Sequence, residues 1–235
     1  MKNLLPILSL LFLFSCKKST EVPDNGVKNE SSQFAECNAA LSACISSNAA
    51  YCLFGYKWGA TNPLSTSGSA VAGPKEAGGS LTFSFQEENG LVNTHAQINL
   101  PSRSFSSLPS CAKDEIRRAL REWSAAANID FEELPENSQS DIRFWVAEIR
   151  QSGIGYPRYP TSPCSSFSGN VIIKENVRFN TCETFHLFLL HEIGHVLGLG
   201  HVNTANIMSP DFEDFNLTGL QAGDIEGIRE LYGER

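Results

Sequence analysis

The segment LLHEIGHVLGLGHVNTANIMSP, residues 189–210, constrains the fold more than any other part of the chain. His191 and His195 are four residues apart, so on an α-helix their side chains project from one face, one turn apart. Gly198 can end that helix in a left-handed conformation, and the turn would bring His201 back toward the first two imidazoles. The spacing therefore predicts a helix, an abrupt turn and three convergent imidazoles.

Three convergent imidazoles suit one catalytic zinc ion, because such sites use three protein ligands and leave the fourth position to water. A structural zinc site would need a fourth protein ligand, and Cys182 lies a whole helix earlier. Glu192 stands beside the metal face without being an obvious ligand. A bound zinc ion lowers the pKa of its water and polarises a carbonyl, and a carboxylate can move the proton to a leaving amine. We predict that Glu192 is this general base and acid.

The N-terminus has the features of a targeting segment. A short basic start precedes an apolar stretch, Leu4 to Phe14, that is too short to cross a bilayer as a helix. The stretch ends in Leu-Phe-Ser-Cys at Cys16, which resembles the lipobox of bacterial lipoproteins. That resemblance implies cleavage after residue 15 and lipidation of Cys16, and so an exported protein anchored in a bacterial cell envelope, at the outer membrane or cell surface. The alternative is an ordinary secretory signal with a chance cysteine.

Export makes disulfides expected. Besides Cys16 the chain has six cysteines: Cys37, Cys44, Cys52, Cys111, Cys164 and Cys182. The sequence leaves their pairing open. A weak preference falls on Cys164 with Cys182, because both flank one predicted strand. The net charge of −8 argues against a nucleic-acid partner, because phosphate binding needs a basic surplus. We expect protein or peptide substrates, membrane contact through the lipid anchor, and a monomer.

The chain divides into a signal peptide at 1–15, a tether with a cysteine-containing segment at 16–55, and one domain at 56–235. Residues 36–55 are a pro-segment, a spacer or a disulfide-linked cap, with a short helix or helical pair expected. Periodicity predicts strands at 81–85, 141–146 and 170–174, helices at 111–127, 184–198 and 218–233, and a loop at 155–169. Strands and helices are mixed without regular alternation, which favours an α+β fold.

Several segments resemble the matrixin family of metzincin zinc peptidases. HEIGHVLGLGH resembles the family's zinc helix, NIMSP its Met-turn, and LTGLQAGDIEGIRELYG its C-terminal helix, and weaker matches begin near residue 56. The resemblance implies a twisted mixed sheet, a zinc-binding helix, a Met-turn in which Met208 forms the floor beneath the zinc, and a C-terminal helix. It also implies a substrate pocket near Leu187, with Pro210 and Phe212 as its outer wall and an apolar residue preferred after the scissile bond.

The chain departs from the family pattern in three respects. Residues 147–185 contain no histidine, so we expect no second, structural zinc. Calcium is possible, but no convincing acidic loop supports it. The cysteine-switch motif PRCG is missing, so latency through a cysteine thiolate is not expected.

Five further positions lie outside the motif. His186 lies about 140° around the helix from His191, which predicts a residue at the surface or one that supports the ligands from behind. His95 is predicted to be structural or exposed to solvent. Gly153, Gly155 and Tyr156 either shape the edge along which substrate lies or belong to a plain loop.

The leading hypothesis is an exported, lipid-anchored zinc endopeptidase. His191, His195 and His201 would bind the metal and Glu192 would move the proton. Two alternatives remain open. One is an envelope-anchored zinc-binding module without turnover, and the other is a zinc hydrolase of a non-protein amide, such as one in the cell wall.

Overall fold

The computed structural model describes residues 37, 48–53, 56–58, 79–159 and 163–235. The predicted signal peptide, Cys16, the tether and most of the cysteine-containing segment lie outside these residues. Within the described part of the chain, no helix is both long enough and apolar enough to cross a membrane.

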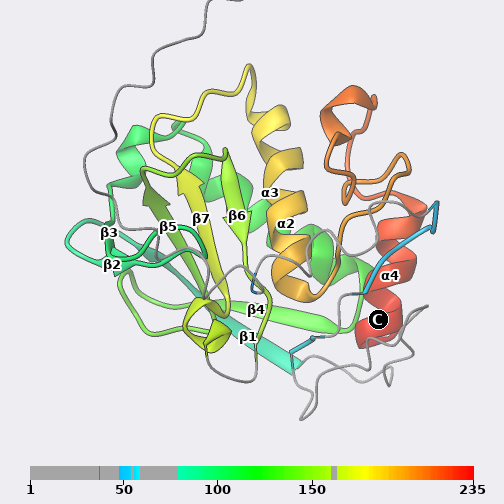
Figure 1. The fold of residues 1–235 in the computed structure, drawn as a ribbon. Coiled ribbons are helices and arrows are strands. Elements are labelled where there is room, and N and C mark those ends of the chain that lie inside the picture. Colours follow the sequence, from blue (N-terminus) through cyan, green and yellow to red (C-terminus); the bar gives the residue numbers. More distant parts are fainter. Residues whose placement is uncertain (1–36, 38–47, 54–55, 59–78, 160–162) are drawn as a thin grey trace, which may run out of the picture.

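A five-stranded sheet forms the centre of the molecule (Figure 1). Its order is β4-β1-β5-β7-β6, in which the first four strands are parallel and β6 is an antiparallel edge strand. The strand bounds are β1 Gly79–Gln86, β4 Ile129–Glu133, β5 Ile142–Ala147, β6 Gly153–Gly155 and β7 Asn170–Lys174. A separate hairpin pairs β2 Leu91–Val92 with β3 Leu100–Pro101.

The predicted strands at 81–85, 141–146 and 170–174 are confirmed, because β1, β5 and β7 contain them. Side chains that alternate along β5, at Ile142, Phe144 and Val146, point into one core and are fully buried. The strands β4 and β6 were not predicted. β4 carries three acidic residues in five positions, and β6 is only three residues long with two glycines, so neither shows an apolar pattern.

Among the described residues, three α-helices confirm the α+β class and the three predicted helices. The first two pack on one face of the sheet, and the third packs beside the first (Figure 1). The three helices are α2 Ala112–Ala126, α3 Cys182–Leu197 and α4 Ala222–Tyr232, with 3-10 turns η2 Phe105–Ser107, η3 Cys164–Phe167 and η4 Phe212–Asp214. The other face of the sheet is covered by loops and a second apolar cluster around Tyr156, Phe167 and Ile172. The predicted loop at 155–169 thus includes the end of β6 and the turn η3.

Disulfides join Cys37 with Cys164 and Cys111 with Cys182. The preferred pairing of Cys164 with Cys182 was therefore wrong. Although both cysteines flank β7, Cys164 lies in η3 among the loop-covered cluster, whereas Cys182 begins α3 on the helical face. Cys182 is instead bonded to Cys111, which immediately precedes α2, so this disulfide links the starts of two packed helices.

Two described N-terminal stretches, residues 48–53 and 56–58, pack against the end of α3 and against α4. Leu53 forms a β-bridge with Leu199, and the indole Nε1 of Trp58 donates to the carbonyl of Val196 at 2.9 Å. The buried Lys57 ammonium donates to the carbonyl of Leu231 at 2.7 Å. Leu53 thus packs on the domain, while the role of residues 36–55 stays a prediction.

Candidate metal centre

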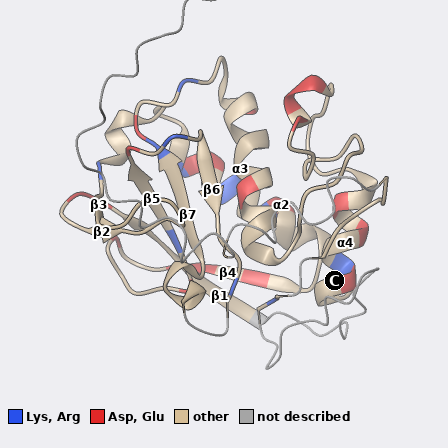
Figure 2. Ribbon diagram, viewed as in Figure 1, with Lys and Arg blue, Asp and Glu red and all other residues tan. Residues whose placement is uncertain are grey.

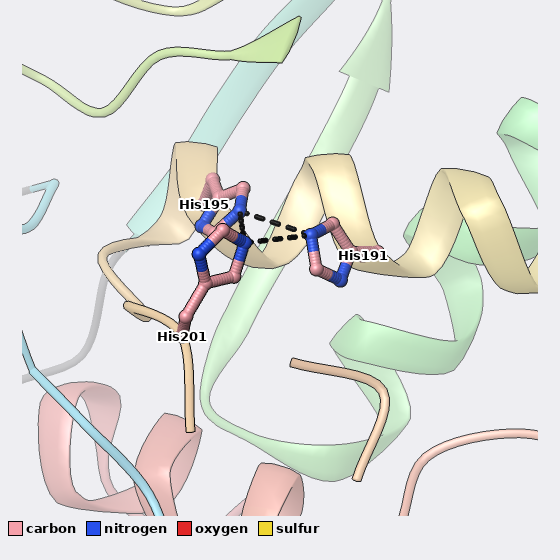
Figure 3. Close-up of side chains that lie close together, drawn as sticks. All are labelled: His191, His195 and His201. Atoms are coloured by element: carbon pink, nitrogen blue, oxygen red, sulfur yellow. Dashed lines mark hydrogen bonds between the residues drawn. The ribbon is translucent and has the colours of Figure 1, made fainter. Parts of the chain in front are cut away.

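Three imidazoles converge at the end of α3 (Figure 3). The Nε2 atoms of His191, His195 and His201 form a triangle with 3.1 Å between each pair. His191 and His195 project from adjacent turns of the helix. Gly198 caps the helix with a φ of 115°, a left-handed conformation that favours glycine, and the chain then returns with His201. The predicted arrangement of helix, turn and three convergent imidazoles is thus present in the structure.

Hydrogen bonds fix two of the rings in the form that binds metal. The Nδ1 atom of His191 donates to the carbonyl of Ile207 at 2.7 Å, and that of His195 donates to the carbonyl of Leu199 at 2.8 Å. Because a carbonyl can only accept, each ring presents the lone pair of its Nε2 toward the centre of the triangle, as a metal ligand would. The buried Nδ1 of His201 has no hydrogen-bond partner among the described residues.

The environment keeps these imidazoles neutral. Burial, together with the nearby His201, lowers the pKa of His191 to about 3, although the Ile207 carbonyl acts in the opposite direction. Burial and the two neighbouring imidazoles also lower the pKa of His195, and burial lowers that of His201. Neutral imidazole is the ligand form of histidine, so no proton has to be displaced from these rings near neutral pH.

The donor set fits zinc. In a tetrahedral site with Zn–N bonds of about 2.05 Å, the ligand nitrogens lie about 3.3 Å apart, close to the spacing seen here. The only group of three or more metal-binding side chains found in the described part of the chain is this one. Three nitrogen ligands and an adjoining cavity match a catalytic site rather than a closed structural one.

Glu192 lines the cavity beside the three histidines and is nine-tenths buried. Burial raises the pKa of its carboxyl to about 8, while a hydrogen bond from the backbone of Gly155 acts to lower it. Such a group exchanges protons near neutral pH, as a general base and acid must.

Met208 lies beneath α3, where its side chain is buried. A Cβ at Gly194 would lie only 2.3 Å from the Met208 sulfur, so the helix needs glycine between His191 and His195 for the methionine to fit. The carboxylate of Asp224, at the start of α4, accepts from the backbone nitrogens of Ile207 and Met208 at 2.9 and 3.1 Å. Sequence reasoning missed Gly194 and Asp224, although an acid at the third position of a helix is a recognisable capping signal.

β6 runs close beside the zinc helix. A Cβ at Gly155 would lie 2.0 Å from the carbonyl oxygen of Glu192, and one at Gly153 would lie 2.3 Å from the Phe188 ring. Both glycines are therefore required by close packing of β6 on α3. Gly153 also lines the cavity, which supports the predicted role of this stretch as an edge for substrate, whereas Tyr156 is buried in the second cluster.

The cavity that contains the histidines has a volume of about 490 Å³. Pro210 and Phe212 also line it, and the Phe212 ring lies 5.2 Å from the His191 ring, centroid to centroid. Leu187 is half-buried against the core and is not among the lining residues, while its neighbour Phe188 is. Glu213 and Asp214 of η4, whose ribbon is red in Figure 2, also line the cavity, and no lysine or arginine does so among the described residues.

Neither remaining histidine joins the metal site. His186 is completely buried between Glu115 and Glu122 of α2, so the surface location considered for it was wrong. His95 is half-buried, and both its backbone nitrogen and its Nδ1 contact the hydroxyl of Tyr156, at 2.9 and 2.8 Å. His95 is therefore structural, one of the two roles predicted for it.

Known proteins similar to this chain share one family. Over 158 residues, the chain is 33% identical to human matrix metalloproteinase-26, a match that covers 60% of this chain and 58% of that protein. It is 32% identical over 136 residues to the hatching enzyme of Paracentrotus lividus, covering 52% of this chain and 22% of the enzyme. Metalloendoproteinase 1 of Glycine max is 29% identical over 138 residues, a match that covers 52% of this chain and 45% of that protein. The chain thus matches at most 58% of the length of these relatives.

The sequence pattern of the family described as Matrixin matches residues 98–233, more than half of the chain. The match includes all three histidines, Glu192, Met208 and Asp224. The family implies zinc, in agreement with the donor set of the three imidazoles. From the spacing of the histidines, their convergence in the fold and this match, we conclude that the chain belongs to the matrixin family.

Proposed function

We propose that this protein is a zinc endopeptidase in which His191, His195 and His201 bind one catalytic zinc ion. The observation that carries the proposal is the triangle of three Nε2 atoms on the wall of a cavity that Glu192 also lines. Zinc in such a site supplies a Lewis acid for the scissile carbonyl and lowers the pKa of a bound water.

The residues of the chain supply proton transfer and orientation. Glu192 takes a proton from the attacking water onto its carboxylate and delivers it to the leaving nitrogen. Met208, packed against Gly194, supports the helix between two of the ligands. These roles require no covalent intermediate with the protein.

β6 offers a place for an extended peptide. It pairs with β7 on one side only, so its other edge can provide backbone hydrogen bonds to a substrate strand. Pro210 and Phe212 give the cavity wall an apolar surface, which favours an apolar side chain just after the scissile bond. The placement of Leu187 near this pocket stays a prediction from family resemblance.

We also propose export and lipid anchoring through Cys16 in a bacterial cell envelope. Two disulfides among the described residues support an oxidising compartment, because such bonds are rare in reducing ones. The lipobox-like sequence carries the anchoring part of this proposal.

A peptide-library cleavage assay on purified protein tests the enzymatic function. We expect endoproteolytic cleavage that a chelator abolishes and added zinc restores, with an apolar residue after the cleaved bond. The Glu192→Ala variant should bind one zinc ion and cleave nothing. A wild type that binds zinc but cleaves no peptide would instead indicate a binding module, and undiminished cleavage by Glu192→Ala would refute the mechanism.

A further inference from the structure

His186 is a fully buried ionisable residue on the zinc helix, outside the metal site. Its Nε2 lies 2.9 Å from a carboxylate oxygen of Glu122, and its Nδ1 lies 3.2 Å from one of Glu115. The first contact is a hydrogen bond, whereas the second lacks hydrogen-bond geometry and is electrostatic. Both acids belong to α2 and are seven residues apart, two turns along one face, so α2 encloses the imidazole from both ends.

Charged side chains of both helices surround this histidine. Arg118 contacts Glu115 at 3.3 Å and Glu183 at 2.8 Å, so one cation of α2 lies beside acids of both helices. Burial acts to raise the pKa of Glu122, but hydrogen bonds from His186 and from the backbone of Leu220 outweigh it, and the pKa is lowered. Glu122 is therefore an ionised group that needs the donors around it.

The carboxylate of Glu122 joins three parts of the fold. One oxygen accepts from His186 of α3, and the other accepts from the backbone nitrogen of Leu220 at 2.9 Å, just before α4. A Cβ at Gly219 would lie 2.6 Å from that second oxygen, so the segment leading into α4 is packed closely onto Glu122. The residue after Glu122 makes a parallel link, since the Trp123 indole donates to the carbonyl of Leu190 at 3.2 Å, next to His191.

From the segment leading into α4, hydrogen bonds continue to a metal ligand. Gln221 donates from its backbone nitrogen to Asp224 at 2.8 Å, and Asp224 accepts from the nitrogen of Ile207 at 2.9 Å. The carbonyl of Ile207 in turn accepts from the Nδ1 of His191 at 2.7 Å. One connected set of contacts thus runs from His186 to His191. It passes through α2, the start of α4 and the Met-turn.

We propose that His186 is a positioning residue for the metal centre. With Glu122 it fixes α3 against α2 and against the segment that enters α4, and so it sets the direction of the His191 ring. This inference rests on the proposed zinc site. Without the imidazole, Glu122 keeps the Leu220 hydrogen bond but loses its contact with the zinc helix, and the three Nε2 atoms no longer hold their spacing.

The test compares wild type with His186→Gln and Glu122→Gln in the full chain. His95→Gln serves as the matched control, because it removes a structural histidine whose partner is Tyr156 of the second apolar cluster rather than a residue of α2 or α3. Zinc affinity is measured by competition with a chromophoric chelator, and ligand geometry by the visible spectrum of the Co²⁺-substituted protein. We expect each variant to bind zinc about 10-fold more weakly and to shift the cobalt bands, and kcat to fall with KM nearly unchanged. The control should match wild type in zinc affinity, cobalt spectrum and kinetic constants.

The double variant adds a second criterion. If His186 and Glu122 act as one unit, combining the substitutions weakens zinc binding little more than either alone. Variants with wild-type zinc affinity and cobalt spectrum would overturn the proposal, even if their Tm falls. Should His186→Gln fail to fold, Glu122→Gln decides, since its amide oxygen can still accept from Leu220. A wild type that binds no zinc would refute the proposed function itself, and this inference with it.

Discussion

The Nδ1 of His191 donates to the backbone carbonyl of Ile207 across 2.7 Å, which joins the first metal ligand to the residue preceding Met208. The same Ile207 donates its nitrogen to Asp224 at 2.9 Å. The Met-turn is therefore hydrogen-bonded both to a histidine of the proposed metal site and to α4. It sets the tautomer and direction of one ligand while α4 holds the turn in place.

Removing the metal should destabilise the fold. Three Nε2 lone pairs face one another at 3.1 Å, and metal that binds only the folded state stabilises it by mass action. With free zinc at about 1,000 times its Kd, the gain is about 4 kcal/mol, which for this chain length raises Tm by about 10 °C. Thermal unfolding with chelator, and after addition of zinc or magnesium, measures it. An equal effect of magnesium would contradict an imidazole site.

In the metal-free protein, the contribution of Glu192 to stability should fall as pH rises from 4.5 to 8. The Glu192 carboxyl has an ordinary pKa of 4.5 when unfolded and about 8 when folded, so over this range only the unfolded chain ionises. The full difference corresponds to about 5 kcal/mol. The three histidines act in the opposite sense, since their lowered pKa values cost stability below about pH 6.5, so in wild type they oppose the Glu192 effect over the lower part of this range.

Glu192→Gln isolates this contribution, because it keeps the histidines and removes the carboxyl. In urea unfolding of the metal-free proteins, the free energy of unfolding of the variant should rise relative to that of wild type between pH 4.5 and 8. Above pH 8 the difference should stay constant. A constant difference between pH 4.5 and 8 would show that folding does not raise the pKa of Glu192.

Substitution of Gly155 by alanine should damage catalysis. The new Cβ would lie 2.0 Å from the Glu192 carbonyl oxygen, so β6 has to move away from α3 and the Gly155 hydrogen bond to the carboxyl is lost. Displacements of about 1 Å can cost about 100-fold in rate, and we expect kcat/KM to fall by that order. Gly90→Ala is the control, since its Cβ meets the Trp145 side chain at 2.8 Å instead. Comparable losses in both variants would mean that only general stability is affected.

Gly227→Ala should test whether the N-terminal segment belongs to the folded domain. In an open helix this change stabilises by about 0.5–1 kcal/mol. Here the added Cβ would lie 2.8 Å from the Tyr51 Cβ and 3.0 Å from Leu199, so we expect a loss of about 1–3 kcal/mol in the free energy of unfolding. Glu226→Ala, exposed on the same helix, is the control. A stabilised Gly227→Ala variant would show that residues 49–53 do not pack on α4 in solution.

Much of the fold follows from local periodicity. The apolar positions of α2, at Ile116, Leu120 and Trp123, are spaced for one face and are buried as a unit, and Gly198 and Gly233 end the helices that they follow. Such signals are local, because they depend on the 3.6-residue repeat and on the conformational freedom of glycine. β6 and the link between Cys111 and Cys182 carry no local signal, since both depend on what lies across the fold.

The sequence by itself determined the three imidazoles, their helix, the turn after Gly198 and the carboxylate beside them, because these are set by spacing within one short segment. Only the tertiary structure decided what surrounds them. It showed Gly194 opposite Met208, Asp224 holding the Met-turn, and Phe188, beside Leu187, in the cavity wall. It also buried His186 between two acids of another helix, because the partners of a buried polar group come from segments far apart in the chain.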